Sequence, residues 1–255
     1  MSVVWRSSLV LCLVAVLAAC GSTPKFKPAM GVDSPAEINA KLGLNYMQHG
    51  NYEVAEGKLL RALEQNPKLG KAHHYLAELY RRTEREDMAK ESYRRALKYI
   101  HDDMSLHNNF AWFLCEQGDY AEAVDRLIMV AESRNYNRPD QAYVNAGLCA
   151  LRIPDEVRAE KYLRQALTIN PRLPNALYKM AELSFQHQNY MKARAFMQRY
   201  AAVARQTPQS LLLGVRLELK LGDRQAVDAY AQQLSTEFPG ADESAEMEKL
   251  LHPSE

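Results

Sequence analysis

The sequence has little of what enzymes and nucleic-acid-binding proteins usually carry. Its charges almost cancel, with 32 Lys and Arg against 31 Asp and Glu, so no basic stripe predicts binding to nucleic acid or to an anionic membrane surface. It has no Gly-rich phosphate loop, and no Ser or Cys stands in a local nucleophile signature. We therefore expect no enzymatic activity, no small-molecule substrate and no nucleic-acid partner.

Histidine is present without the neighbours that a metal site needs. The seven histidines include His73, His74, His101 and His107, but no Cys or acidic residue recurs beside them at ligand spacing. The sequence therefore predicts no metal site and no bound cofactor.

Long apolar runs are also absent, apart from a short one at the N-terminus. That run, Leu9 to Leu17, follows the basic Arg6 and leads to Cys20, which is typical of a bacterial export signal and too short for a membrane span. Residues 17–20, Leu-Ala-Ala-Cys, resemble the lipobox of bacterial lipoproteins. The resemblance implies that the signal at 1–19 is removed and that Cys20 carries the lipids. The alternative is an ordinary signal peptide that is cut nearby, with Cys20 incidental.

Lipid on Cys20 would set the location of the chain. Each buried CH₂ contributes about 0.8 kcal/mol, so two or three acyl chains anchor a soluble domain stably. In the lipoprotein class, Asp after the cysteine tends to retain the protein on the inner membrane, whereas here the residue is Gly21. We expect an outer-membrane lipoprotein that faces the periplasm, with 20–35 as a flexible tether.

The rest of the chain repeats with a period of about 34 residues. Small residues recur at fixed positions, as Gly43, Ala55 and Ala62 in the first unit. Gly or Ala at these positions lets the two helices of a unit approach closely, which is the tetratricopeptide pattern. One period later the same positions hold Ala77, Ala89 and Ala96.

The period divides the chain into six predicted units. We expect an all-α, right-handed superhelical solenoid of tetratricopeptide helix-turn-helix repeats, which binds other proteins and rarely does chemistry. A capping helix and tail at 241–255 would cover the open end. The units are 36–69, 70–103, 104–139, 140–173, 174–207 and 208–240.

Cysteine is scarce, with four residues in the whole chain. Cys12 lies in the predicted signal. Cys115 and Cys149 are one period apart, so they lie on the first helices of adjacent units, which stack side by side. In the oxidising periplasm we expect a disulfide between them. Two separately buried thiols are the alternative.

In tetratricopeptide arrays, the residues near positions 2, 5, 9, 12 and 13 of each first helix line the concave groove. Here these positions are unusually apolar, and exposed apolar patches mark partner surfaces. We therefore expect a partner-binding groove, unless the tether, the terminal helix or a neighbouring unit fills part of it. The candidate residues are Ala40, Leu44, Met47, Asn108, Trp112, Val144, Leu148, Leu151, Tyr178 and Phe185.

Three stretches resemble one family over nearly the whole chain. They are 108–115 (Asn-Asn-Phe-Ala-Trp-Phe-Leu-Cys), 145–149 (Asn-Ala-Gly-Leu-Cys) and 213–218 (Leu-Gly-Val-Arg-Leu-Glu). Together with the lipobox they resemble the type IV pilus biogenesis and stability lipoproteins, the PilF/PilW family. The resemblance implies a pilotin, which carries secretin subunits to the outer membrane and promotes their assembly into a multimeric pore for pilus biogenesis and twitching motility. The alternative is a different lipoprotein scaffold, serving outer-membrane barrel assembly or regulating a cell-wall synthase.

Overall fold

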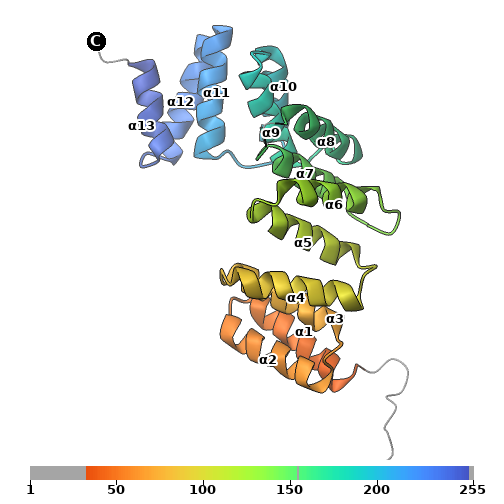
Figure 1. Ribbon diagram of the computed structural model, residues 1–255. Coiled ribbons are helices and arrows are strands. Elements are labelled where there is room, and N and C mark those ends of the chain that lie inside the picture. Colours follow the sequence, from red (N-terminus) through yellow and green to blue (C-terminus); the bar gives the residue numbers. More distant parts are fainter. Residues whose placement is uncertain (1–32, 154, 253–255) are drawn as a thin grey trace, which may run out of the picture.

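The computed structural model describes residues 33–153 and 155–252, which form thirteen α-helices and no strand. The helices stack in pairs from α1 and α2 at one end of the array to α11 and α12 at the other (Figure 1), which confirms the expected all-α array of helix pairs. The predicted signal at 1–19, Cys20 and the tether up to residue 32 lie outside the described residues. The helices are α1 (Pro35–Gln48), α2 (Tyr52–Gln65), α3 (Gly70–Arg82), α4 (Glu86–Tyr99), α5 (Met104–Glu116), α6 (Tyr120–Glu132), α7 (Pro139–Ala150), α8 (Glu156–Ile169), α9 (Pro174–Gln186), α10 (Tyr190–Ala201), α11 (Pro208–Leu221), α12 (Arg224–Glu237) and α13 (Asp242–Leu251).

Local signals in the sequence begin and end these helices. Ser34 caps α1, because its Oγ accepts a hydrogen bond from the backbone N–H of Glu37 at 3.2 Å while the Glu37 carboxylate accepts one from the backbone N–H of Ser34 at 2.7 Å. Proline also opens α1, α7, α9 and α11, since its fixed φ suits a first helical turn. The turns after α1 and α5 contain Gly50 and Gly118 at φ of 78° and 89°, a region that favours glycine. Short turns of this kind fold the second helix of a unit back onto the first.

Small residues set the distance between the two helices of a unit. Ala55 of α2 is fully buried, and its carbonyl oxygen lies close to Gly43 of α1. A Cβ added to Gly43 would lie 2.5 Å from Cγ of Leu59. Gly147 repeats the arrangement in the fourth unit, where an added Cβ would lie 2.7 Å from Cγ of Leu163. The helices therefore approach to direct contact at these positions.

The apolar core is continuous along the first five units and includes Leu213 and Leu217 of α11. The other buried apolar side chains of the sixth unit form a second core. That second core contains Leu211, Val227 and Leu234 together with Met247 of α13. Met247 is buried, so α13 turns an apolar side chain inward over the end of the array. The helix lies within the predicted 241–255 and acts as a cap, which a solenoid end requires.

Ion pairs join the sixth unit to the fifth. Arg194 of α10 pairs with Glu218 of α11, which is only 3% exposed. The same guanidinium reaches Asp223, the residue that caps α12, with Nη2 and Oδ2 2.5 Å apart. These contacts, together with Leu213 and Leu217 of α11 in the first core, hold the last unit on the array.

Alanine substitutions at Gly43 and Gly57, both in the first unit, are expected to change the stability of the protein in opposite directions. Gly43→Ala is expected to lower the free energy of unfolding by about 1–3 kcal/mol, because the new methyl group overlaps the fully buried Leu59. Gly57→Ala is the matched control, since nothing lies within 4 Å of its added Cβ. It should raise stability by about 0.5–1 kcal/mol through helix propensity. Urea unfolding followed by circular dichroism measures both, and an equal gain in the two variants would contradict the close contact.

Candidate functional site: a groove along the first helices

Three adjoining cavities form a groove along α3, α5, α7 and α9. The largest, about 660 Å³, lies between Trp112 and Leu148 and extends to Lys179. A second cavity of about 210 Å³ shares Trp112 with it. A third of about 300 Å³ shares Leu151 and Lys179 with it. We call these three cavities the groove, and the largest the Trp112 cavity.

The groove contains four of the residues that the sequence predicts for it. Trp112, Leu148 and Leu151 line the Trp112 cavity, and Asn108 lines the second cavity. Three further predicted residues are half-buried and pack against the core without lining these cavities, namely Leu44, Tyr178 and Phe185.

Three predicted groove residues are instead part of the core. Ala40, Met47 and Val144 are 3%, 2% and 1% exposed, so the prediction that they line an open groove is wrong. The reason is the packing of successive first helices, α1 on α3 and α5 on α7. A side chain on the edge of a first helix is covered by a neighbouring first helix, and the repeat position alone does not reveal this cover.

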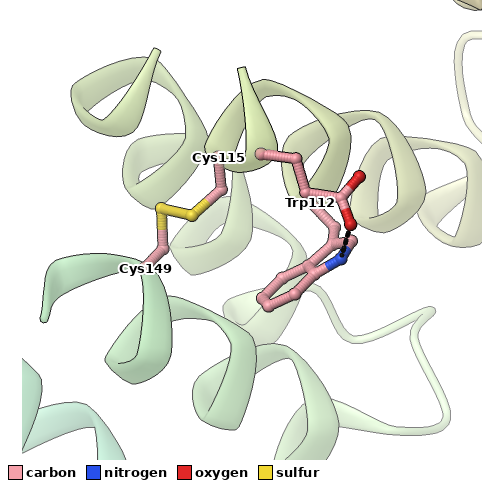
Figure 2. Close-up of a disulfide and its surroundings, with 4 residues drawn as sticks. Trp112, Cys115 and Cys149 are labelled. Carbon is pink, nitrogen blue, oxygen red and sulfur yellow. Dashed lines mark hydrogen bonds between the residues drawn. A yellow bond between two sulfur atoms is a disulfide. The ribbon is translucent and has the colours of Figure 1, made fainter. Parts of the chain in front are cut away.

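Cys115 of α5 and Cys149 of α7 are joined by a disulfide, with their Cα atoms 5.9 Å apart (Figure 2). Both residues are buried, and Cys115 also lines the Trp112 cavity. Trp112 lies on the same helix as Cys115, and Leu148 directly precedes Cys149. The bond therefore ties together the two helices that supply opposite walls of the cavity.

A network of charged groups fixes the indole of Trp112. Its Nε1 donates a hydrogen bond to Oε1 of Glu116 at 2.7 Å, the dashed line in Figure 2. The same carboxylate accepts from Nη1 of Arg81, on the neighbouring unit, at 3.1 Å. Arg81 also pairs with Glu78 at 3.4 Å. Arg81 thus holds both carboxylates of this wall and balances one of their two negative charges, and the network links the second and third units.

Tyr93 of α4 also contacts the charged network beside Trp112. Its hydroxyl donates to the carboxylate of Glu78. Burial raises the pKa of Tyr93 far above its ordinary value, and the adjacent Glu78 carboxylate raises it further. The hydroxyl therefore stays protonated and remains a donor to Glu78.

Carboxamide side chains from α5 and α7 form a row, and three of them, Asn108, Asn109 and Asn145, line the second cavity of the groove. Gln141 Nε2 donates to Asn145 Oδ1 at 3.2 Å, and Asn145 Nδ2 donates to Asn108 Oδ1 at 3.2 Å. Asn109 Nδ2 lies 3.1 Å from Nε2 of His74 on α3. Burial lowers the pKa of His74, so its neutral ring accepts this hydrogen bond. We call Gln141, Asn145, Asn108 and Asn109 the carboxamide row.

Sequence reasoning missed most of the polar residues of the groove. Asn109 and Asn145 occupy the same position in the third and fourth units, a signal that the repeat contained. Arg152 and Lys179 also line the Trp112 cavity. No periodic signal marks Arg152, because it lies in the turn after α7. Lys179 occupies in the fifth unit the position that Asn109 and Asn145 hold in theirs, so the repeat contained its signal too.

The histidines serve packing and local hydrogen bonds. His73 Nε2 lies 2.9 Å from the carbonyl oxygen of Pro67, and His107 Nε2 lies 2.8 Å from that of His101. Within 33–153 and 155–252, no group of three His, Cys, Asp or Glu side chains is placed to hold a metal ion. Over the same residues, none of the helices has the length and apolar character needed to cross a membrane.

Comparison with known protein families agrees with the helix pairs and the groove. Tetratricopeptide repeat models match residues 40–104 and 109–174, and a second such model matches 155–214. The chain is therefore a tetratricopeptide repeat protein, a class that forms scaffolds for binding other proteins.

Similarity to individual proteins shows to which family of tetratricopeptide repeat proteins the chain belongs. Over 246 residues, 95% of this chain and 98% of the relative, the sequence is 32% identical to the type IV pilus assembly protein PilF of Pseudomonas aeruginosa. The solved structure of that PilF has a TM-score of 0.78 at 32% identity, covering 85% of this chain and 97% of its own. The structure of PilW, described as a widely conserved type IV pilus biogenesis factor, has a TM-score of 0.76 at 28% identity, covering 84% and 99%. The chain belongs to the PilF/PilW family of type IV pilus biogenesis proteins, as its sequence motifs indicate.

Because Cys115 and Cys149 are joined by a disulfide, the free energy of unfolding should be higher in the oxidised protein than in the reduced protein. Reduction, or the double substitution Cys115→Ser and Cys149→Ser, is expected to lower the free energy of unfolding by about 3–4 kcal/mol, the chain-entropy value for a loop of this length. Urea unfolding with and without reductant measures the loss. Reductant should have no effect on the double variant, which is the control. Peptide mapping of unreduced protein that finds both cysteines as free thiols would contradict the bond.

Because Met47 is buried, its substitution is expected to lower the stability of the array. The repeat position alone would predict weaker partner binding with unchanged stability. Met47→Ala is expected to cost about 2–5 kcal/mol because it leaves a cavity in the core, and Met47→Glu should cost at least as much because it buries an unpaired charge. Leu148→Glu, in the half-exposed wall of the groove, should cost clearly less. Urea unfolding of the three variants tests this order, and equal stability of Met47→Glu and Leu148→Glu would refute it.

Proposed function

We propose that this chain is an outer-membrane lipoprotein that binds secretin subunits of the type IV pilus machinery and promotes their localisation and multimerisation in that membrane. The observation that carries the proposal is the full-length relation to PilF, a type IV pilus assembly protein, which covers 95% of this chain and 98% of the relative. A relation over both whole chains favours a shared role in pilus assembly over the reuse of a common repeat.

The proposed function divides between two parts of the chain. Lipid on Cys20 holds the protein at the periplasmic face of the outer membrane, since two or three acyl chains are needed for stable anchoring. The tetratricopeptide array then binds a secretin subunit. Tethering raises the effective concentration of bound subunits near the membrane, and this promotes their assembly into multimers.

The groove has the composition of a protein-binding site. Trp112, Leu148 and Leu151 are half-buried apolar side chains that meet in one cavity. Tryptophan is enriched among the residues that dominate binding energy, and such residues cluster in pockets. Because the disulfide and the Glu116 hydrogen bond already fix the walls, little conformational entropy is lost when a partner binds.

Removal of the lipid site tests the proposal. Cys20→Ser is expected to leave the array folded but to release the protein from the outer membrane, and secretin multimers should fall and twitching motility should be lost. Cys12→Ser, within the apolar run of the signal, is the matched control and should leave both unchanged. Membrane fractionation and gels that preserve secretin multimers measure the result.

Two outcomes would contradict parts of this proposal. Normal secretin multimers in the outer membrane of Cys20→Ser cells would overturn the role of the lipid anchor. Normal multimers in cells that lack the chain altogether would overturn the secretin function itself.

A further inference from the structure

We propose that the edge of the array at the ends of α8 and α10 binds the anionic phospholipid headgroups of the membrane that anchors the chain. Three exposed arginines, Arg172, Arg199 and Arg205, make the contact. The apolar Ile169, which is 49% exposed, ends α8 three residues before Arg172. We call these four residues the basic edge. The inference rests on the proposed function, because the lipid on Cys20 brings the array to that membrane.

The nearly balanced charge of the whole chain conceals two regions of opposite charge. Residues 161–217 contain nine Lys and Arg and one acidic residue, Glu182. Residues 218–255 contain nine Asp and Glu but three Lys and Arg. The first region runs from α8 into α11, and the second continues from α11 to the terminal helix. Because a surface attracts partners through its local charge, the balanced total does not exclude an electrostatic contact here.

Ion pairs within the protein account for part of the positive region. The acidic last unit and Glu246 of α13 take up two of its basic side chains, Arg194 and Arg216. Lys179 pairs with Glu182, and Glu160 is shared by two further basic side chains, Arg164 and Lys192. The basic residues of this region that are exposed and have no ion pair within the described residues are Lys161, Arg172, Arg199 and Arg205.

Hydrogen bonds gather the three arginines of the basic edge at the ends of two neighbouring second helices. Nη2 of Arg199 donates to the carbonyl oxygen of Pro171 at 3.2 Å, which places Arg199 of α10 beside Arg172 in the turn after α8. The Tyr200 hydroxyl donates to the carbonyl oxygen of Arg205 at 3.2 Å, which folds the turn after α10 back onto that helix. The three side chains therefore form one local concentration of positive charge.

The groups that border the basic edge do not cancel its charge. Neither of its two turns, 170–173 and 202–207, contains Asp or Glu. Asp140 reaches the first turn from α7 and accepts a hydrogen bond from Nδ2 of Asn170 at 3.2 Å. The helix ends add little, because the C-termini of α8 and α10 meet the N-termini of α9 and α11, with opposite partial charges of about half an elementary charge.

The chain enters α1 at the same edge of the array. The two helices of a unit run antiparallel, so second helices end and first helices begin at one edge. The starts of α1, α9 and α11, at Pro35, Pro174 and Pro208, all belong to this edge (Figure 1). Since the predicted tether leads into α1, the lipid and the basic edge can contact one membrane at two separate points.

A membrane surface suits this arrangement better than a folded acidic protein. The arginines extend from two turns and from the last turn of α10, and none of them lines the groove. Fluid headgroups move to meet such side chains, whereas a folded partner needs a fixed set of complementary charges. Ile169 adds the apolar side chain that interfacial surfaces place among headgroups. Because the lipid anchor supplies a high effective concentration, a weak second contact is enough to orient the array.

Hydrogen exchange of the lipidated protein in nanodiscs tests this contact. The lipid anchor holds the protein on discs of phosphatidylcholine and on discs that also contain phosphatidylglycerol. We expect the backbone amides of 170–173 and 202–207 to exchange about fivefold more slowly on the anionic discs, the factor expected from one arginine near an anionic surface. High salt should abolish the difference, because it screens the attraction.

A triple variant removes the charge of the basic edge. Protein with Arg172→Gln, Arg199→Gln and Arg205→Gln should exchange equally on both kinds of disc. Helix content and retention of the disulfide check its folding. If loss of the Arg199 bond to Pro171 unfolds the array, the double variant Arg172→Gln and Arg205→Gln replaces it.

The matched control removes the same charge elsewhere on the array. Arg61, Arg94 and Lys98 are exposed on α2 and α4 and have no ion pair among the described residues. Protein with Arg61→Gln, Arg94→Gln and Lys98→Gln should keep the slow exchange of 170–173 and 202–207 on anionic discs.

Three results would overturn the membrane contact. The first is equal exchange of the unchanged protein on neutral and anionic discs. The second is slow exchange that persists in the folded triple variant. The third is slow exchange that appears only when polyglutamate is added, which would make an acidic polypeptide the occupant of the basic edge.

The inference and the lipid anchor fail in distinguishable ways. Protein that stays on both kinds of disc with unchanged exchange shows that the basic edge is wrong and leaves the anchor standing. Protein that leaves the neutral discs shows that the anchor is wrong. The basic edge is then decided by the anionic discs alone, where binding supports it and a lack of binding overturns it.

Discussion

The direct contact between the two helices of each unit is the constraint on which the rest of the structure depends. Gly43 and Gly147 permit that contact, since an added Cβ would strike Leu59 and Leu163. Because the helices meet so closely, a unit buries its remaining apolar side against the next unit. The stacking that follows places the first helices side by side along one face. The groove is therefore a consequence of helix packing, built from side chains that the packing leaves partly exposed.

Covalent and ionic links then make part of this face rigid. The disulfide between Cys115 and Cys149 joins α5 to α7, and the Arg81 to Glu116 pair joins α3 to α5. Both links flank Trp112, so the Trp112 cavity lies between helices that are joined to each other. A site that is preformed in this way loses less entropy on binding. The last unit is organised differently, with a second core and a junction made by Arg194 together with Leu213 and Leu217.

Membership of the PilF/PilW family and the geometry of the groove address different levels of function. The family relation assigns the chain to type IV pilus biogenesis. The proposed secretin role adds membrane anchoring through lipid on Cys20 and a partner-binding surface in the array.

The sequence by itself determined the helix pairs, the terminal helix and the family, because small residues, prolines and motifs recur at a fixed period along the chain. It also placed Cys115 and Cys149 on neighbouring helices and identified Trp112, Leu148 and Leu151. Only the tertiary structure decided that Met47 is buried. Only it brought Asn108, Asn109, Asn145 and Arg152 to one groove. The physical reason is that a repeat position fixes where a residue lies on its own helix, whereas the packing of successive units decides which neighbour covers it.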